Sequence, residues 1–368
     1  MSDCDVKEFK LCELLKIYNG TKYDHLNKGD IPLYGSGGLM SHVDEALYSG
    51  EAILLPRKGT LSNIMYVNES FWTVDTMYYA VVNDKLADAF YLYSYLSQLD
   101  LSNLDSGSTL PSMTKSAYES IVVKLPDLKI QKAVATILFN IRKKLETNNK
   151  INQELEAMAK TLYDYWFVQF DFPDQNGKPY KSSGGKMVYN PELKREIPEG
   201  WGLEKLSHFL TIKNGKDHKH LQDGKFAVYG SGGIMRTVTD YLYSGESILF
   251  PRKGTLNNVM YVNEKFWTVD TMFYSEVNKN NSALYVFYSV KDIDFNKLNT
   301  GTGVPSMTSS ILYDLSIIVP EDNILEKFNT VVKRNYETIK LNNIQNQELI
   351  QLRDWLLPIL MNGQVKVE

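Results

Sequence analysis

Residues 34–83 read YGSGGLMSHVDEALYSGEAILLPRKGTLSNIMYVNESFWTVDTMYYAVVN, and the chain repeats this stretch without a gap at residues 229–278. Of the 50 aligned positions, 36 are identical. The match resumes further along at an offset of 194, for example between residues 111–114 and 305–308. The repeated unit is therefore a whole lobe with the segment that follows it. A period this long indicates a duplicated domain rather than a solenoid, whose repeats run to about 50 residues.

The first part of each repeat is rich in predicted strands. Ile64–Val67 and Phe71–Val74 are short, β-branched or aromatic, and bounded by Gly, Asn or Pro. Pro126 and Pro320 end the two lobes, because proline is poorly tolerated inside strands and helices. The sequence predicts a mixed α/β chain in which two similar lobes alternate with two helical segments.

The second part of each repeat has a heptad pattern, because apolar or neutral residues recur at spacings of four and three. About 35 helical residues make a rod of roughly 50 Å. Polar seam positions fix register and partner number, which favours two rods packed on one another over two helices that each pack on their own lobe. Pro358 is expected to interrupt the end of the second rod. The predicted seam consists of Leu138, Ile141, Leu145, Asn148, Asn152 and Leu155, and of Val332, Asn335, Ile339, Asn342, Asn346 and Leu349.

Composition narrows the class of protein. The chain has 368 residues, which suggests two to three domains. Its two cysteines, Cys4 and Cys12, exclude a disulfide framework and a four-cysteine zinc site. No apolar run reaches about 18 residues, and the N-terminus lacks the apolar stretch of a signal peptide, so we expect a cytoplasmic protein without a membrane span. The net charge of −4 by itself argues weakly against a nucleic-acid binder.

Catalytic motifs are absent from the sequence. It contains no P-loop, no His-Glu-x-x-His, no Gly-x-Ser-x-Gly and no Asp/Asn-Pro-Pro-Tyr/Phe of the kind that amino-methyltransferases use. The run Asp217–His220 contains residue types that can bind a metal ion. The first repeat has a histidine, His25, at only one of the two corresponding positions, so a solvated loop is favoured over a metal site. The sequence predicts no metal site, no bound cofactor and no catalytic residue.

The candidate contact residues lie in loops that both repeats contain. Arg in Arg-Lys-Gly-Thr can bind guanine through O6 and N7, Lys can neutralise phosphate, and Asn can bind adenine. The Gly-Ser-Gly-Gly turn can offer backbone N–H groups to phosphate. The alternative is that these segments are an ordinary solvated hairpin and an ordinary turn. The candidate DNA-binding residues are Tyr34, Gly35, Ser36, Gly37, Arg57, Lys58, Thr60, Asn63, Ser112 and Thr114, and Tyr229, Gly230, Ser231, Gly232, Arg252, Lys253, Thr255, Asn258, Ser306 and Thr308.

The segment between the repeats carries a family resemblance. Leu162–Pro173 reads LYDYWFVQFDFP and is followed by NGKPY at residues 176–180, SGGK at 183–186 and IPEGW at 197–201. In this order, the motifs resemble the central region of the specificity subunits of Type I restriction–modification systems. The resemblance extends over nearly the whole chain, because lobe–rod–lobe–rod is that family's layout. Ile130 stands where the family often has Glu, which leaves the details of the helix start open.

The resemblance implies a division into target recognition domain 1 (1–127), helical spacer 1 (128–175), target recognition domain 2 (176–320) and helical spacer 2 (321–368). It implies two similar domains separated by two long helices, which form an antiparallel coiled coil with pseudo-twofold symmetry. The partners would be double-stranded DNA and two modification (methyltransferase) subunits, with restriction subunits as further partners. S-adenosylmethionine and ATP are expected on those partner subunits, and this chain would be a non-catalytic reader of a bipartite DNA target.

The likeness of the two lobes predicts similar, inverted half-sites and therefore a nearly palindromic target. Asymmetry is expected where the repeats differ, as at Ser41 and Arg236 or at Ser70 and Lys265. The first lobe holds 10 Lys and Arg against 16 Asp and Glu, so partner subunits are expected to supply much of the phosphate neutralisation. The rival interpretations are a protein-interaction scaffold with duplicated binding lobes and a self-sufficient methyltransferase or nuclease.

Overall fold

The chain folds into two compact units. A computed structural model shows one unit of Met1–Asn149 with Asn343–Glu368 (unit 1) and another of Lys150–Asn342 (unit 2). Each unit contains one lobe and one half of each long helix, because the helix halves pack on each other as well as on the lobe. The domain boundaries that the family resemblance implies are different, because they separate the lobes from the long helices. The structure describes residues 6–101, 111–299, 301, 303 and 305–361.

The lobe of unit 1 is built on a six-stranded sheet of order β2-β7-β5-β6-β3-β4. Among these strands, only β3 and β6 pair in parallel, with Leu33 opposite Trp72. A smaller sheet pairs β1 (Lys7–Lys10) with β8 (Val122–Leu125). The strands of the large sheet are β2 (Leu15–Asn19), β3 (Lys28–Gly35), β4 (Gly38–Val43), β5 (Tyr48–Pro56), β6 (Met65–Thr73) and β7 (Met77–Val82).

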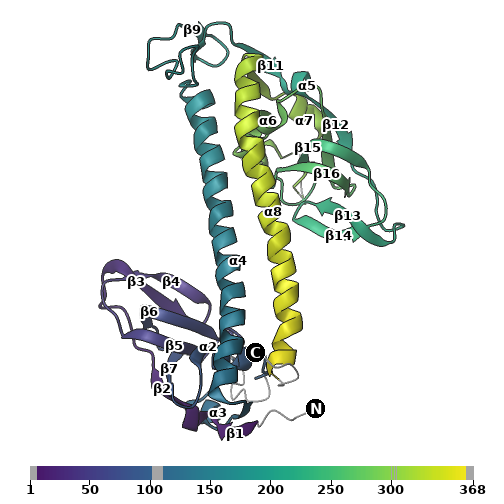
Figure 1. Cartoon of the computed structure of the whole chain (residues 1–368). Coiled ribbons are helices and arrows are strands. Elements are labelled where there is room, and N and C mark those ends of the chain that lie inside the picture. The colour runs from purple at the N-terminus through teal and green to yellow at the C-terminus, as the bar shows by residue number, and fades with distance from the viewer. Residues whose placement is uncertain (1–5, 102–110, 300, 302, 304, 362–368) are drawn as a thin grey trace. The chain divides into compact units, whose positions relative to one another are not determined.

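Unit 2 repeats this topology in the order β12-β17-β15-β16-β13-β14 (Figure 1). Two small sheets join β11 (Gly202–Lys205) to β18 (Ser316–Val319) and β9 (Met187–Asn190) to β10 (Arg195–Pro198). The same strand order in both lobes follows from their shared sequence. The large sheet consists of β12 (Leu210–Asn214), β13 (Asp223–Gly230), β14 (Gly233–Val238), β15 (Tyr243–Pro251), β16 (Met260–Thr268) and β17 (Met272–Val277).

The burial of the central strand on both faces explains why an apolar run precedes Arg-Lys-Gly-Thr in each repeat. Side chains alternate between the two faces of a strand, so a strand covered on both faces is apolar throughout. In β5, Ile53 and Leu55 belong to the core beneath the helices, whereas Ala52 and Leu54 pack on the opposite face with Phe71. The end of β5 is therefore held from both sides, and the loop that follows it starts from a fixed point.

Short helices lie between strands along the chain in each lobe. In unit 1, Asp88 caps α2 by accepting a hydrogen bond from Tyr91 N at 2.9 Å. The buried amide of Gln131 accepts from Asp88 N (3.0 Å) and donates to Pro126 O (2.8 Å), which fixes the start of the long helix α4 against the lobe. These short helices are α1 (Leu11–Leu14), α2 (Ala89–Leu96) and α3 (Lys115–Glu119) in unit 1, and α5 (Leu206–Phe209), α6 (Ala283–Lys291), η3 (Phe295–Leu298) and α7 (Ser309–Tyr313) in unit 2.

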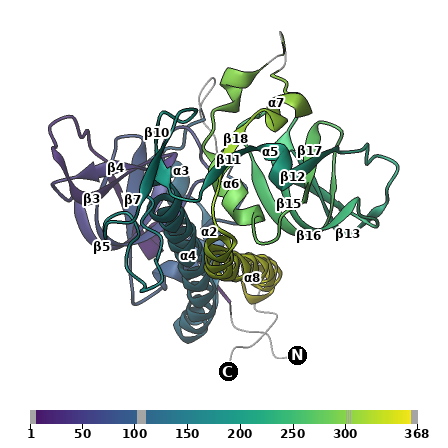
Figure 2. The same cartoon turned by 90° about the horizontal axis from the view of Figure 1, so that it is seen from above.

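The long helices are α4 (Leu128–Tyr163) and α8 (Asp322–Met361), and α4 continues into a π-helical turn, η2 (Asp164–Val168). Within each unit their halves lie side by side (Figures 1 and 2). The expectation that Pro358 interrupts the second rod was wrong, because α8 runs through it to Met361. A proline this near the C-terminus removes only one helical hydrogen bond, and the buried Leu360 anchors the last turn in the core of unit 1.

Hydrogen-bonded asparagines join the helix halves in both units. In unit 1, the fully buried Asn148 donates to Gln345 Oε1 and Asn346 Oδ1, both at 2.9 Å. In unit 2, Asn342 donates to Asn152 Oδ1 at 2.8 Å and Asn335 donates to Leu155 O at 3.4 Å. In these contacts, residues later in α4 meet residues earlier in α8, so the two helices are antiparallel. Every predicted seam residue is buried or half-buried.

We expect Asn148→Ala to lower the free energy of unfolding by about 1–3 kcal/mol, because the buried Asn346 on α8 loses the donor to its side-chain oxygen. Replacing the pair, as Asn148→Leu with Asn346→Leu, should restore or exceed the original stability, since both polar partners then leave the seam. Urea unfolding of the full chain measures both variants. Equal losses in the single and the double variant would show that the pair does not act as a buried polar contact.

Candidate nucleic-acid interface

The Gly-Ser-Gly-Gly segment forms a tight turn at the edge of each sheet. In unit 1 it joins β3 to the edge strand β4, and Gly35 pairs with Gly38 to close the hairpin. Gly38 has φ of +114°, a backbone conformation that strongly favours glycine. The turn leaves Ser36 and Gly37 at the tip of an otherwise ordered ribbon.

The Arg-Lys-Gly-Thr segment lies against this turn. Gly59 has φ of +91°, and a Cβ built on it would meet Ser36 Oγ at 2.9 Å, so glycine permits the close approach of loop and turn. The loop backbone is fixed on its other side as well, since Arg57 N donates to Thr76 O at 2.8 Å and Gly59 N donates to Pro111 O at 3.0 Å. Two glycines thus bring a cationic loop and a turn together on a rigid sheet.

A third segment completes this surface. Lys58 forms an isolated β-bridge with Ser112, and Met113 N donates to Arg57 O at 2.9 Å. The structure therefore unites three stretches that the sequence marked separately: the turn at residues 35–38, the loop at 57–60 and the segment at 111–113. We call this set the loop–turn surface.

Unit 2 builds the same surface from its own residues. Gly254 has φ of +90°, and a Cβ on it would meet Ser231 Oγ at 2.9 Å. Gly254 N donates to Pro305 O at 3.1 Å, and Lys253 bridges to Ser306 as its counterpart does in unit 1. Each lobe thus presents one copy of the loop–turn surface, with the same backbone contacts in both.

The arginines of the loops are oriented by aromatic rings. The Arg57 guanidinium lies 5.9 Å from the centroid of Tyr78 and donates to Asp75 O at 3.4 Å, and that of Arg252 lies 5.8 Å from the centroid of Phe273. Among the described residues, neither Arg57 nor Lys58 forms an ion pair with an acidic side chain. The cations are therefore available to phosphate or to the guanine edge.

Several of the candidate DNA-binding residues contribute to the structure of the lobe. The Asn63 amide donates to Ser36 O at 2.9 Å, and the Asn258 amide donates to Ser231 O at 2.8 Å, so these asparagines support the turn. Thr114 Oγ1 caps α3 by accepting from Ala117 N. Thr60 and Thr255 accept a backbone bond within the loop through their carbonyl oxygens, and Thr308 occupies the N-cap of α7.

The tyrosines at the start of the turns are also engaged internally. Tyr34 Oη donates to Glu69 Oε1 at 2.9 Å, and Tyr229 Oη donates to Glu264 Oε1 at 2.8 Å. Burial, with the neighbouring Glu69, raises the pKa of Tyr34 to about 12. Burial, with the neighbouring Glu264, also raises the pKa of Tyr229. Both phenols keep their protons and hold the hairpin to the neighbouring strand.

Sequence reasoning missed an apolar pair beside each turn. Leu39 and Met40 are 56% and 51% exposed, and Ile234 and Met235 are 61% and 60% exposed. A Cβ on Gly35 would meet Met40 Sδ at 2.6 Å, so the thioether lies on the turn. A shift in the β3–β4 register between Leu33 and Tyr34 places Met40 in a bulge. The sequence signal for these residues is a pair of adjacent apolar residues, flanked by Gly and polar residues, in both edge strands.

Other site chemistries find no support in the described part of the chain. No group of three or more His, Cys, Asp or Glu side chains in it is placed to hold a metal ion. His25 and His220 instead lie edge-on to Trp72 and Trp267. None of its helices is long and apolar enough to cross a membrane. Cys12 is an exposed free thiol, and Cys4 lies outside the described residues.

Comparison with known proteins agrees with this arrangement. The model of the Type I restriction modification DNA specificity domain matches twice, at residues 4–157 and 198–351. The MjaIX specificity subunit of Methanocaldococcus jannaschii is 29% identical over 297 residues, which cover 73% of this chain and 66% of that protein. The MjaVIII specificity subunit of the same organism is 24% identical over 352 residues, 86% of this chain and 76% of that one.

The fold also has a solved counterpart. The crystal structure of the Type I restriction–modification S subunit from M. genitalium superposes with a TM-score of 0.75, covering 98% of this chain and 97% of that one at 15% identity. That likeness concerns the fold, whereas the family rests on the domain matched over most of the sequence. The chain belongs to the family of Type I restriction modification DNA specificity domains, and it is a non-catalytic DNA-recognition chain that carries this domain twice.

Proposed function

We propose that the chain is the specificity subunit of a Type I restriction–modification complex and that it binds a bipartite, nearly palindromic target in double-stranded DNA. The observation that carries this proposal is the loop–turn surface, which recurs with the same glycine contacts and the same paired cations in both lobes. Equal surfaces select similar base sequences, and one surface per lobe accounts for two half-sites. In this proposal, the domain boundaries given by the family resemblance separate the readers from the helical spacers.

The partners supply the chemistry in this proposal. Two modification subunits bring S-adenosylmethionine for adenine-N6 methylation, and restriction subunits bring ATP-dependent activity. Such a complex works in the cytoplasm, where the host DNA is. The acidic balance of the first lobe, 10 Lys and Arg against 16 Asp and Glu, is compatible with this division, because partner subunits then neutralise much of the phosphate charge.

Sequencing of methylated adenines tests the proposal. A host that expresses this chain with its modification subunit should carry N6-methyladenine in one bipartite motif, with two similar and inverted half-sites around a spacer of fixed length. Deleting the gene for this chain alone should remove that methylation. Two unrelated half-sequences would contradict the palindromic target, and an unchanged methylation pattern after the deletion would contradict the function itself.

A further inference from the structure

The apolar pairs beside the two turns lie on edge strands that are open on both faces. In β4 the four residues Leu39–His42 are all exposed, and in β14 so are Ile234, Met235 and Thr237. Side chains alternate between the two faces of a strand, so consecutive exposed residues show that neither face is covered. Near the turn, the hairpins β3–β4 and β13–β14 are therefore open two-stranded ribbons at the edge of each sheet.

An exposed apolar pair is an unusual feature of an edge strand. Natural proteins usually place charged residues or proline there, because an exposed apolar edge promotes aggregation. In this chain Leu39 and Met40, and likewise Ile234 and Met235, are between 51% and 61% exposed. The pair occurs in both lobes although the residues that follow it differ. A repeated apolar pair of this kind indicates a surface that a partner covers.

The turn places each apolar pair close to the cationic loop. A Cβ on Gly35 would meet Met40 Sδ at 2.6 Å, and a Cβ on Gly59 would meet Ser36 Oγ at 2.9 Å. The thioether and the cationic loop thus approach two consecutive residues of the turn, and unit 2 has the same two approaches. A partner that covers this surface has to present an apolar group close to groups that accept hydrogen bonds from cations.

The major groove of B-DNA offers this combination. Each thymine has its C5-methyl group there, and the same groove presents O6 and N7 of guanine as acceptors. The major groove is about 12 Å wide and admits a two-stranded β-ribbon, whereas the minor groove is about 6 Å wide and presents no methyl group. The open ribbon, the apolar pair and the nearby cations together match the major groove.

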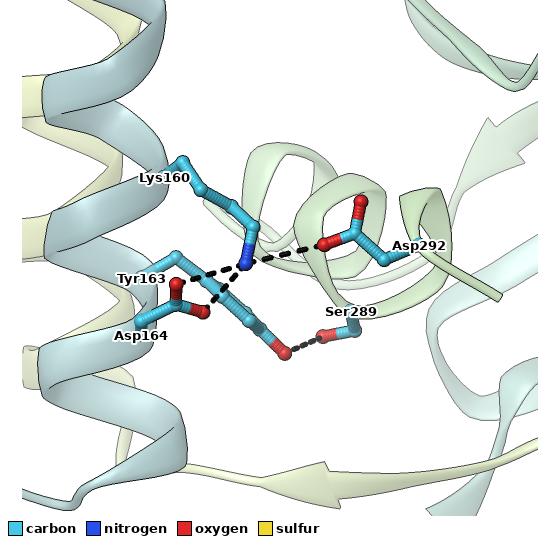
Figure 3. A network of polar contacts seen from close by, with 5 residues as sticks. All are labelled: Lys160, Tyr163, Asp164, Ser289 and Asp292. Atoms are coloured by element: carbon cyan, nitrogen blue, oxygen red, sulfur yellow. Dashed lines mark hydrogen bonds and ion pairs between the residues drawn. The ribbon is translucent and has the colours of Figure 1, made fainter. Parts of the chain in front are cut away.

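Polar contacts fix the lobe of unit 2 to α4, and the ribbon with it. Figure 3 shows Lys160 between two carboxylates, with Nζ 2.7 Å from Asp164 Oδ1 and 3.1 Å from Asp292 Oδ2. Tyr163 Oη donates to Ser289 Oγ of α6 at 3.2 Å. Because α6 packs in one core with the central strand β15, the sheet that carries the ribbon is held to the helix. Little freedom is then lost when the ribbon binds.

We infer that Leu39 and Met40 in unit 1, and Ile234 and Met235 in unit 2, contact the C5-methyl groups of thymines in the two half-sites. The inference rests on the proposed function for the half-sites, and it adds the chemical group that these four side chains recognise. A half-site that contains an adenine for methylation also contains a thymine, so the methyl group is present where the inference requires it.

Deoxyuridine in place of thymine tests the inference, because it removes only the C5-methyl group. The complex of this chain with its modification subunits should bind a target with deoxyuridine in both half-sites at least ~10-fold more weakly than the thymine target. Each methyl group that is buried contributes a factor of roughly 4. Deoxyuridine in the spacer alone is the control and should leave binding unchanged.

The outcomes separate the inference from the proposed function. Equal binding of the thymine and deoxyuridine targets would overturn the inference and leave the apolar pairs to a protein partner. A complex that does not distinguish its target from a scrambled duplex would contradict the proposed function instead.

A variant without the apolar pairs assigns the preference to these side chains. Leu39→Ala and Met40→Ala, combined with Ile234→Ala and Met235→Ala, should bind the thymine and deoxyuridine targets equally. The four side chains are exposed, so the lobes should remain folded. Leu39→Met with Ile234→Met keeps the surface apolar and should keep the preference for thymine. A preference that survives the four alanine substitutions would overturn the assignment.

Lys160→Met separates contact with the methyl group from placement of the lobe. It removes the ion pair to Asp292 and leaves both ribbons intact, so any loss of affinity should be the same for the thymine and deoxyuridine targets. If Lys160→Met abolished the preference for thymine, the preference would depend on the placement of the lobe, and the assignment to the apolar pairs would be overturned.

Discussion

Replacing both loop arginines, as Arg57→Ala with Arg252→Ala, is expected to weaken binding of the assembled complex to its target by about 2–6 kcal/mol. Each arginine that binds a guanine edge contributes about 1–3 kcal/mol of discrimination, and contributions from separate lobes should add. Rings orient both guanidinium groups, at Tyr78 and at Phe273, so they enter the interface with little freedom left to lose.

A competition assay with target and scrambled duplexes at one salt concentration measures this loss. If the arginines contact bases, binding to the target falls much more than binding to the scrambled duplex. A uniform fall on all sequences would assign them to phosphate, and unchanged binding would show that the loop is only a hairpin. Lys124→Ala is the matched control, because Lys124 is an exposed cation of unit 1 that pairs with Glu8 on the small sheet.

Deleting one heptad from each long helix should change the spacer that the complex accepts. Removing residues 147–153 and 341–347 keeps the seam in phase and shortens each rod by about 10 Å, the length of about 3 bp of B-DNA. The deletion removes the buried asparagines on both helices together, so no donor or acceptor is left alone in the seam. We expect loss of methylation at the original target and activity on targets with a spacer shorter by about 3 bp.

A library of targets with spacers of different lengths measures this shift. A shortened chain that still methylates the original target would contradict the role of the helices in setting the spacer. Circular dichroism and unfolding of the shortened chain are the control, since an unfolded variant also loses methylation but accepts no spacer at all.

Local regularities made part of the fold predictable. The heptad seam depends on residues three and four apart, so the positions of Asn148 and Asn342 in the helix contacts follow from the sequence alone. The duplicated lobe was visible because residues 34–83 recur at 229–278. The order of the strands was not predictable, because the parallel pairing of β3 with β6 joins segments far apart in the chain.

The candidate site was predictable as a set of segments but not as a set of roles. The turn, the cationic loop and the segment at residues 111–113 do form one surface in the structure. The side chain of Asn63, however, turns to Ser36 O, a partner 27 residues earlier that no local pattern identifies. The phenol of Tyr34 likewise donates a hydrogen bond to Glu69 on the neighbouring strand, whereas the sequence alone suggested a contact with DNA. Polar residues at such positions form hydrogen bonds within the lobe, because an unpaired buried polar group is costly.

Binding of the assembled complex to duplexes that carry two, one or no half-sites tests the central claim most directly. The claim is that each lobe reads one of two similar half-sites. A duplex with two inverted copies of one half-site at the proper spacing should bind at least ~100-fold more tightly than a duplex in which either copy is scrambled. Equal binding of the intact and the half-scrambled duplexes would contradict the account.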